Sequence, residues 1–267
     1  MPAGRMLRRV GLLGACTALV LPAKSFAAAA LELRGEVRLE GTPVLRLVAA
    51  NSGDEAATDV VPEVVYQRHT YRGETAVLGP GERREWSFAL AVPSGPGTFP
   101  VTVRAGYRDG SGHAGATPLV ALVRTLDAPR SPIRASLELQ PVSNRGAGQL
   151  RLENPDAQPV AGRVAFILPG GLYTEPESLP AQVAAGNEAT VPFVLENHGA
   201  RPATYPIFAV FEYLTAGARY CVVARQSVAV TAGGPGGRVL PLVVGAAALA
   251  ITLALLALAS RRAAARA

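Results

Sequence analysis

Cysteine is nearly absent from this chain. Among its 267 residues there are two cysteines, Cys16 and Cys221, and Cys16 falls in an N-terminal stretch that we expect to be removed. One remaining cysteine excludes an intramolecular disulfide, so packing must stabilise the folded part. Cys221 lies in the apolar run Tyr220 to Ala224, where a buried cysteine behaves as a small hydrophobic residue; an intermolecular bridge is the alternative.

Motifs that carry chemistry are also missing. The sequence has no Gly-x-Ser-x-Gly, no His-Glu-x-x-His, no glycine-rich phosphate loop before a helix and no aspartate-rich calcium loop. The histidines, His69, His113 and His198, are far apart in the sequence, and none has a neighbour at metal-ligand spacing. We therefore predict no catalytic residues, no metal site and no cofactor, and interpret the chain as a non-enzyme.

The net charge looks basic, yet the basic residues gather at the two ends. The chain carries a formal charge of +6 and has a pI near 9.8, and no lysine follows Lys24. Between residues 31 and 231, 18 arginines face 20 acidic residues, which leaves a net charge of −2 there. Nucleic acid is thus excluded as a predicted partner. The terminal basic residues are Arg5, Arg8, Arg9, Lys24, Arg238, Arg261, Arg262 and Arg266.

Long apolar runs occur at both ends. Residues 239–260 contain no charge, and a helix of this length spans about 33 Å, enough to cross a membrane core of about 30 Å. Residues 1–27 have a basic start, a short apolar core and small residues before Ala27, as in a cleaved signal peptide. These features predict a single pass in the cytoplasmic membrane. The ectodomain would lie in the periplasm or cell exterior, and the basic tail 261–267 in the cytoplasm.

One alternative concerns the N-terminal stretch. Leu13-Gly14-Ala15-Cys16 resembles a lipobox, in which Cys16 would be acylated after processing. The apolar run continues past Cys16, as in an ordinary signal core, so we favour cleavage after Ala27. The sequence leaves lipidation of Cys16 open.

The region between the two apolar runs is duplicated. Three landmarks recur after 103 to 106 residues: Asn51–Asp54 as Asn154–Ala157, Leu78–Glu82 as Val183–Asn187, and Thr98–Val101 as Thr204–Ile207. Nearly constant offsets indicate two copies of one unit of roughly 100 residues. The predicted boundaries are 31–126 for the first copy, a linker at 127–132, 133–231 for the second copy, and a glycine-rich linker at 232–238.

Hydrophobic residues within each copy alternate with polar ones. Trp86, Phe88 and Leu90 alternate with Glu85, Ser87 and Ala89, and glycine- or proline-containing turns interrupt such runs every eight to twelve residues. This period predicts half-buried strands. The fold class is therefore all-β, with two tandem immunoglobulin-like antiparallel sandwiches followed by one C-terminal transmembrane helix.

The order of these motifs resembles a known group of modules. Asn-x-Gly, an apolar strand, a Pro-Gly-Glu turn, a second apolar strand, Pro-Gly-Thr-Phe-Pro-Val and Tyr-x-Asp-Gly are similar to CARDB-type and NPCBM-associated immunoglobulin-like domains of bacterial surface proteins. The second copy is similar through Leu168–Leu172 and Thr204–Pro206. The resemblance implies adhesion, spacing or partner binding, and it names no residue as functional.

Two segments are candidate contact sites. Tyr66, Arg68, His69, Tyr71 and Arg72 interleave aromatic and basic side chains near a strand end, which suits contact with a glycan or an anionic partner; a strand with one solvated face is the alternative. In the second copy Phe208 and Val210 occupy the outward positions that Thr102 and Arg104 occupy in the first, so the strand around Phe208 is apolar on both faces.

Something must cover the second apolar face. We consider either the first domain or a partner protein, with Phe208, Val210, Cys221 and Val223 as the candidate interface. Together these observations predict a membrane-anchored extracytoplasmic binding or spacer protein, whose partner is another membrane protein or an envelope polymer. The alternatives are a surface protein with a processed GlyGly-type C-terminal sorting tail and an accessory subunit of a transporter. Ligand, partner and oligomeric state stay open.

Overall fold

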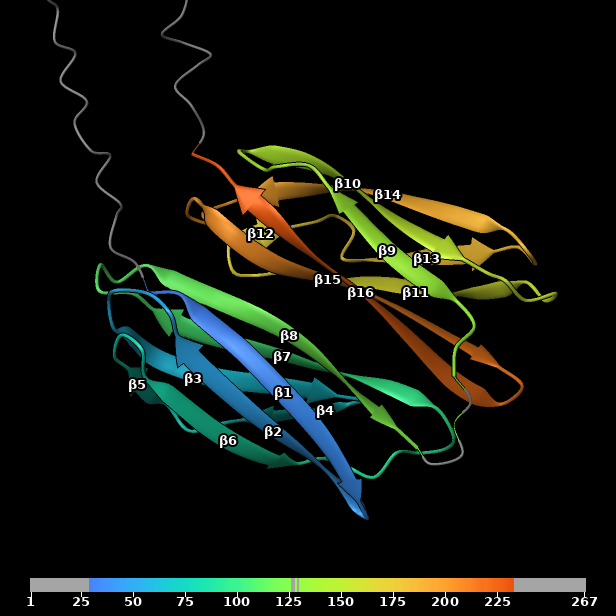
Figure 1. Ribbon diagram of the computed structural model, residues 1–267, viewed down its shortest axis with the longest axis horizontal. Helices are drawn as coiled ribbons and strands as arrows, with labels where there is room; N and C mark the ends of the chain where they lie inside the picture. The colour runs from blue at the N-terminus through green and yellow to red at the C-terminus, as the bar shows by residue number, and fades with distance from the viewer. Residues whose placement is uncertain (1–28, 126–127, 129, 233–267) are drawn as a thin grey trace, which may run out of the picture.

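The computed structural model describes residues 29–125, 128 and 130–232 (Figure 1). This part of the chain is all-β, as predicted, and is built of antiparallel strands. Within it, no helix is long and apolar enough to cross a membrane. The predicted signal peptide with Cys16 and Ala27, the glycine-rich linker beyond Ala232, the span 239–260 and the tail 261–267 lie outside the described residues.

The first copy contains eight strands in two facing sheets. Strands β1, β2 and β6 form one sheet, while β4, β3, β7 and β8 form the other, to which β5 adds through β3. Along β2, buried Leu45, Leu47 and Ala49 alternate with more exposed neighbours, as the period of two requires. The strands are β1 (Leu31–Glu40), β2 (Thr42–Asn51), β3 (Ala57–Tyr66), β4 (His69–Arg72), β5 (Ala76–Leu78), β6 (Arg83–Ala89), β7 (Thr98–Arg108) and β8 (Ala114–Arg124).

The second copy repeats this plan with one change. Its sheets have the orders β12-β14-β10-β9 and β13-β11-β15-β16, so the short strand β12 belongs to the sheet opposite to that of its counterpart β4. The strands are β9 (Arg134–Leu139), β10 (Arg145–Glu153), β11 (Val160–Ile167), β12 (Leu172–Tyr173), β13 (Ser178–Val183), β14 (Glu188–Asn197), β15 (Ala203–Thr215) and β16 (Ala218–Val230). The first copy's strands end at Arg124 and the second copy's begin at Arg134, on either side of the predicted linker.

A buried asparagine performs the same task in both copies. The Asn51 side-chain amide donates to the carbonyls of Glu55 and Leu78 at 2.7 and 2.9 Å, and Asn154 donates likewise to Gln158 and Val183 at 2.8 and 3.4 Å. Both asparagines are almost completely buried, so these bonds satisfy backbone groups that water cannot reach. The landmark repeat in the sequence thus marks a structural repeat.

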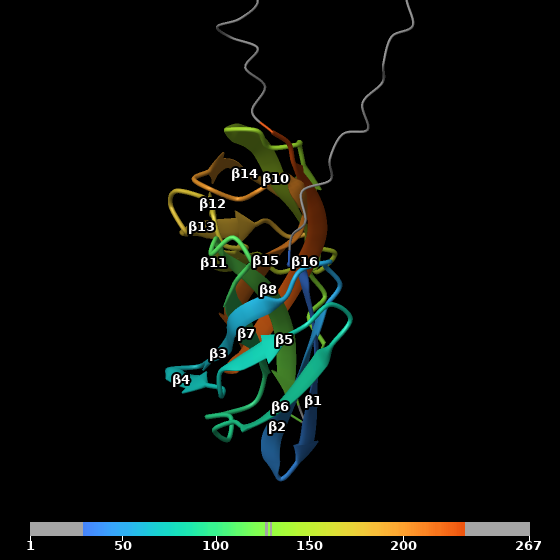
Figure 2. The same ribbon diagram turned by 90° about the vertical axis from the view of Figure 1, so that its left-hand side faces the viewer.

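The two sandwiches fold back on one another. The β7–β8 sheet of the first packs against β15 and β16 of the second, as Figures 1 and 2 show. Their long axes run in opposite directions, so β1 begins and β16 ends at the same end of the molecule, on the left in Figure 1. At the opposite end the Arg124 guanidinium holds the linker by donating to the Ala128 carbonyl at 2.6 Å. A hydrogen bond of 2.8 Å between the hydroxyl groups of Ser131 and Tyr213 also holds it.

Candidate functional site

The predicted aromatic and basic segment is divided between core and surface. Tyr66 is fully buried and packs edge-on against Phe99, with ring centroids 6.5 Å apart, so it cannot contact a ligand as we expected. Tyr66 is buried because it lies two residues after Val64 on β3, so both side chains point to the core side of the sheet. Tyr71 is half-buried, and its hydroxyl accepts the Ala91 N–H at 2.8 Å. The remaining predicted contact residues, Arg68, His69 and Arg72, are exposed.

The apolar face of the second sandwich is covered by the first sandwich. Phe208 is 3% exposed and joins the hydrophobic cluster of the first sandwich, against which Ile167 and Val223 also pack. Val210 is buried as well. These predicted interface residues therefore form an intramolecular junction in the structure. The sequence left open whether the first domain or a partner protein covers this apolar face. In the structure the first domain covers it.

Cys221 is buried and lies two residues before Val223, which packs against the first sandwich. Burial raises the pKa of its thiol well above the ordinary value, and the nearby Glu212 carboxylate raises it further. A thiol in this state is a poor nucleophile, because the thiolate is the reactive form. This behaviour matches the interpretation of Cys221 as a small hydrophobic residue.

Polar contacts close the junction at the end where the chain enters and leaves. The Asp109 carboxylate, which is buried, accepts the N–H groups of Ser111 and His113 at 3.0 Å and pairs with the Arg201 guanidinium at 2.6 Å. Burial alone would raise the pKa of Asp109, but the hydrogen bonds from Ser111 and His113 and the Arg201 charge together lower it. Nearby, burial raises the pKa of Tyr107 to about 12.

The opposite end of the junction mirrors this arrangement. The backbone N–H of Arg219 donates to the Pro96 carbonyl at 3.1 Å, and the Arg219 guanidinium lies 5.7 Å from the centre of the Phe99 ring. Pro96 and Arg201 occupy equivalent loops, just before β7 and just before β15. Ser111 and Arg219 are also equivalent, because Ser111 lies in the β7–β8 turn and Arg219 directly follows the β15–β16 turn. Each copy thus offers the same two loops to the other, as in an interface with two-fold symmetry. The two sandwiches are therefore held at both ends.

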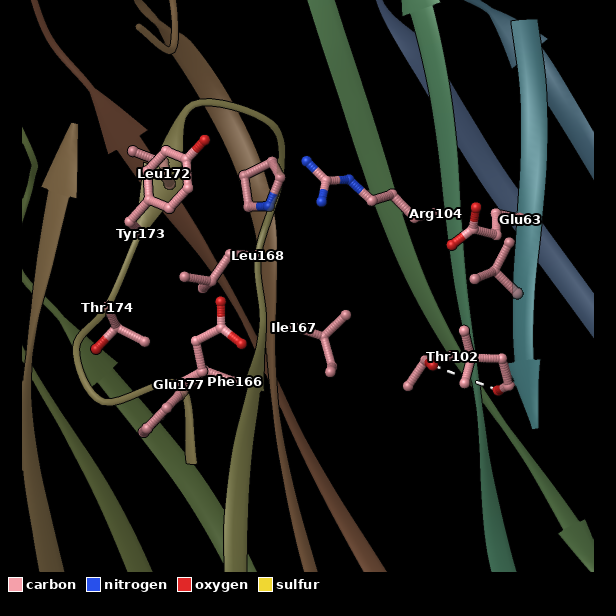
Figure 3. Close-up of a pocket in the computed structure, with 13 residues that line it drawn as sticks. Glu63, Thr102, Arg104, Phe166, Ile167, Leu168, Leu172, Tyr173, Thr174 and Glu177 are labelled. Atoms are coloured by element: carbon pink, nitrogen blue, oxygen red, sulfur yellow. Dashed lines mark hydrogen bonds between the residues drawn. The ribbon is translucent and has the colours of Figure 1, made fainter. Parts of the chain in front are cut away.

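An open groove follows the outward face of β3 and β7 beside the second sandwich. Its central part has a volume of about 410 Å³ (Figure 3), and two further hollows adjoin it. One shares Glu63 and Arg104 with the centre and has a volume of about 520 Å³; the other shares Val65 and Thr102 and has a volume of about 180 Å³. We call the three hollows the long groove.

Alternate residues of the two strands form the floor of the long groove. They are Asp59, Val61, Glu63, Val65 and Gln67 from the β3 side and Pro100, Thr102, Arg104, Gly106 and Arg108 from β7. In the sheet register Glu63 lies opposite Arg72 on one neighbouring strand and opposite Arg104 on the other. Arg108 pairs with Asp59 at 3.7 Å. The floor is thus a mixed sheet face, on which charges of both signs alternate with polar and apolar residues.

The second sandwich supplies the wall. Figure 3 shows Arg104 extending from β7 toward the segment that carries Leu168 and Leu172, which follows β11. This segment is tied to the first sandwich because the Gly170 N–H donates to the Ala116 carbonyl at 2.8 Å. Further along it, Tyr173 is 48% exposed. Its ring lies 4.9 Å from the ring of His198, centre to centre.

Sequence reasoning identified Arg72 at the edge of this groove and missed the residues that line its centre. Glu63 and Arg104 were visible as outward positions of alternating strands, and Tyr173 as an aromatic residue just after a Pro-Gly-Gly turn. Nothing local in the sequence brings the three together. His69, His113 and His198 stay apart on separate loops and strands, and no group of three or more metal-binding side chains occurs within the described residues.

Comparison with known proteins yields weak similarity only. No protein-family model and no curated protein matches the chain. Among solved structures it is similar to red sea bream transglutaminase, at 14% identity and a TM-score of 0.27 over 76% of this chain and 31% of that one. It is also similar to Escherichia coli alpha-2-macroglobulin, at 12% identity and a TM-score of 0.33 over 76% of this chain and 17% of that one.

A third similar structure is a protein of unknown function from Porphyromonas gingivalis W83. The identity is 14% and the TM-score 0.26, over 73% of this chain and 99% of that one. The chain spans less than a third of the transglutaminase and less than a fifth of the macroglobulin. At these TM-scores the similarities carry no information about activity.

Proposed function

We propose that the chain is a single-pass membrane protein whose two immunoglobulin-like sandwiches lie outside the cytoplasmic membrane as a binding or spacer module without catalytic activity. The proposal agrees with the resemblance to CARDB-type and NPCBM-associated modules. One observation carries it: the sandwiches are fixed to each other at both ends, and β1 begins and β16 ends at the same end of the molecule. Such a unit suits a head that is held by one end.

The distance from this head to the membrane has an upper limit. Strand β16 ends at Val230, and the apolar span predicted from the sequence begins at Val239. The eight intervening residues reach at most about 29 Å when fully extended. Under this proposal the end that carries Asp109 and Arg201 faces the membrane, and the linker end faces away from it.

Protease accessibility tests the topology. Protease added to spheroplasts that express the chain with a C-terminal cytoplasmic tag should remove the ectodomain and leave a small tagged fragment. In inverted vesicles the tag itself should be removed, which controls for protease activity. A full-length product that resists protease on intact spheroplasts, yet is cleaved after detergent is added, would contradict the proposal.

A processed C-terminus is the second candidate function. It rests on the glycine-rich stretch Gly233–Gly237, the apolar run and the arginine cluster, which resemble a GlyGly-type sorting tail. Mass spectrometry of the mature protein decides between the two. A C-terminal peptide beyond Ser260 excludes processing, whereas a mature end within the glycine-rich stretch supports it.

A further inference from the structure

The shape of the long groove matches a linear ligand. From Val61 to Tyr66 the strand β3 extends for about 17 Å at the rise of a strand, and the three hollows follow each other along this strand and just beyond both ends of this stretch. Small-molecule sites are usually closed, mostly apolar cavities. This groove is long and open, and its floor mixes charged and polar side chains with valine, proline and glycine, as expected for a section of a polymer.

The floor excludes recognition by strand addition. Strand β3 has neighbours on both sides, β7 on one and β4 and β5 on the other, and β7 lies between β3 and β8. Their backbone groups are therefore used within the sheet. An extended peptide that adds to a sheet needs a free strand edge, and the groove offers side chains instead. This argues against a peptide as its occupant.

The charges of the groove cancel. Four acidic residues and four arginines line it, so it attracts neither a polyanion nor a polycation by net charge: Asp59, Glu63, Glu177 and Glu212 against Arg72, Arg104, Arg108 and Arg219. Two ion pairs use four of them, Asp59 with Arg108 and Glu212 with Arg219. Within the described residues, Glu63, Glu177, Arg72 and Arg104 form no ion pair.

The four groups outside ion pairs are of two complementary kinds. A carboxylate accepts two or more hydrogen bonds, and a guanidinium donates several in a fixed plane. A ligand with neighbouring hydroxyl groups, which both donate and accept hydrogen bonds, satisfies the carboxylates and the guanidinium groups at once. Thr102 adds a hydroxyl to the same floor. The chemistry of the groove is thus that of a ligand rich in hydroxyls and without charge.

An aromatic face stands at the wall. The Tyr173 ring packs at a tilt of 31° against the ring of His198, whose Nε2 lies 3.1 Å from the Glu196 carboxylate, and about half of the Tyr173 surface stays open. A fixed aromatic ring offers an apolar platform at little entropic cost. The apolar face of a sugar ring fits such a platform while its hydroxyls reach the floor. We propose that the long groove binds a neutral, unbranched glycan, with Tyr173, Arg104 and Glu63 as contact residues.

This assignment rests on the proposed function only in giving the ectodomain a binding role. The test uses the full-length chain in a detergent without a sugar head group, and measures binding of gluco-, malto- and chito-oligosaccharides from disaccharide to octasaccharide by titration calorimetry. We expect affinity in at least one series to rise with length and then level off when the groove is filled. Tyr173→Ala, Arg104→Ala and Glu63→Gln should each weaken binding about tenfold or more.

Matched variants separate contact from folding. The matched control for Arg104→Ala is Arg151→Ala, which removes an exposed arginine on the outer face of β10 and should leave binding unchanged. Failure of every oligosaccharide to bind would overturn the proposal, as would binding confined to a polyanion such as polygalacturonate or to unstructured peptides. None of these outcomes alters the protease result, so the failure of this site and the failure of the topology are distinguishable.

Discussion

The two sandwiches use the same strand position for opposite purposes. On β7 of the first, Thr102 and Arg104 face outward and line the long groove. Their counterparts on β15 of the second, 106 residues later, are Phe208 and Val210, which are buried at the junction. One duplicated face has become polar and open, and the other apolar and covered. After a duplication, the outward phase of a strand is free to change because the core phase alone maintains the sandwich.

A second difference lies in the short strand after the third long strand. In the first sandwich β4 forms a hairpin with β3, and the Tyr71 hydroxyl accepts a hydrogen bond from the Ala91 N–H. In the second, the Pro-Gly-Gly turn carries β12 across to β14, where Tyr173 lies opposite Glu196 in the sheet register. The crossing places Tyr173 at the wall of the groove. A local change of turn has therefore created part of the candidate site.

The largest expected effect comes from reversing the covered face. Phe208→Ser combined with Val210→Thr should lower the free energy of unfolding by roughly 3 kcal/mol or more, as loss of a buried aromatic side chain does. It should also separate the melting of the two sandwiches, since their shared apolar contact is lost. Scanning calorimetry of the full-length protein measures both effects.

The counterpart positions in the first sandwich provide the control. Thr102→Ser combined with Arg104→Lys should leave the melting profile nearly unchanged, because surface substitutions usually change stability by less than about 0.5 kcal/mol. Equal destabilisation by the two double variants would show that the two faces are not used differently.

A smaller effect is expected at the polar end of the junction. Because the folded pKa of Asp109 is lowered, its ionised form favours the folded state. This stabilisation is present above the unfolded value of about 3.9 and is lost as the pH falls through the folded value. Asp109→Asn should cost about 1 to 3 kcal/mol at neutral pH and flatten the acid part of the stability curve, measured by urea unfolding.

The exposed Asp59, which pairs with Arg108 at 3.7 Å, is the matched control for Asp109. Asp59→Asn should change stability by less than about 1 kcal/mol, because a solvated ion pair contributes little. If both aspartate variants behave alike, the junction does not depend on the buried carboxylate.

The smallest effect concerns the two short strands. Tyr71→Phe removes the acceptor of the Ala91 N–H and should lower stability by about 1 kcal/mol. Tyr173→Phe should have no measurable effect, because the backbone of β12 holds this strand in place. Chemical denaturation of the two single variants gives the comparison, and a larger loss for the Tyr173 variant would contradict it.

Part of the candidate site was predictable from its own strands. Alternation places Glu63 and Arg104 on the outward phase, and the repeat identifies Phe208 and Val210 as apolar where Thr102 and Arg104 occur in the first copy. The same alternation assigns Tyr66 to the core with Val64, although aromatic and basic residues follow it in the sequence. Residues of one strand obey a local rule, so they were within reach of sequence reasoning.

What the sequence determined by itself is the all-β class, the duplication and the phase of each strand, because turn residues and a period of two act over about ten residues. Only the tertiary structure decided that the copies fold back on each other, that the first sandwich covers Phe208, and that Glu63, Arg104 and Tyr173 share one groove. These outcomes depend on which apolar face finds cover and on which sheet a two-residue strand joins. Packing between segments a hundred residues apart settles both, and no local pattern encodes it.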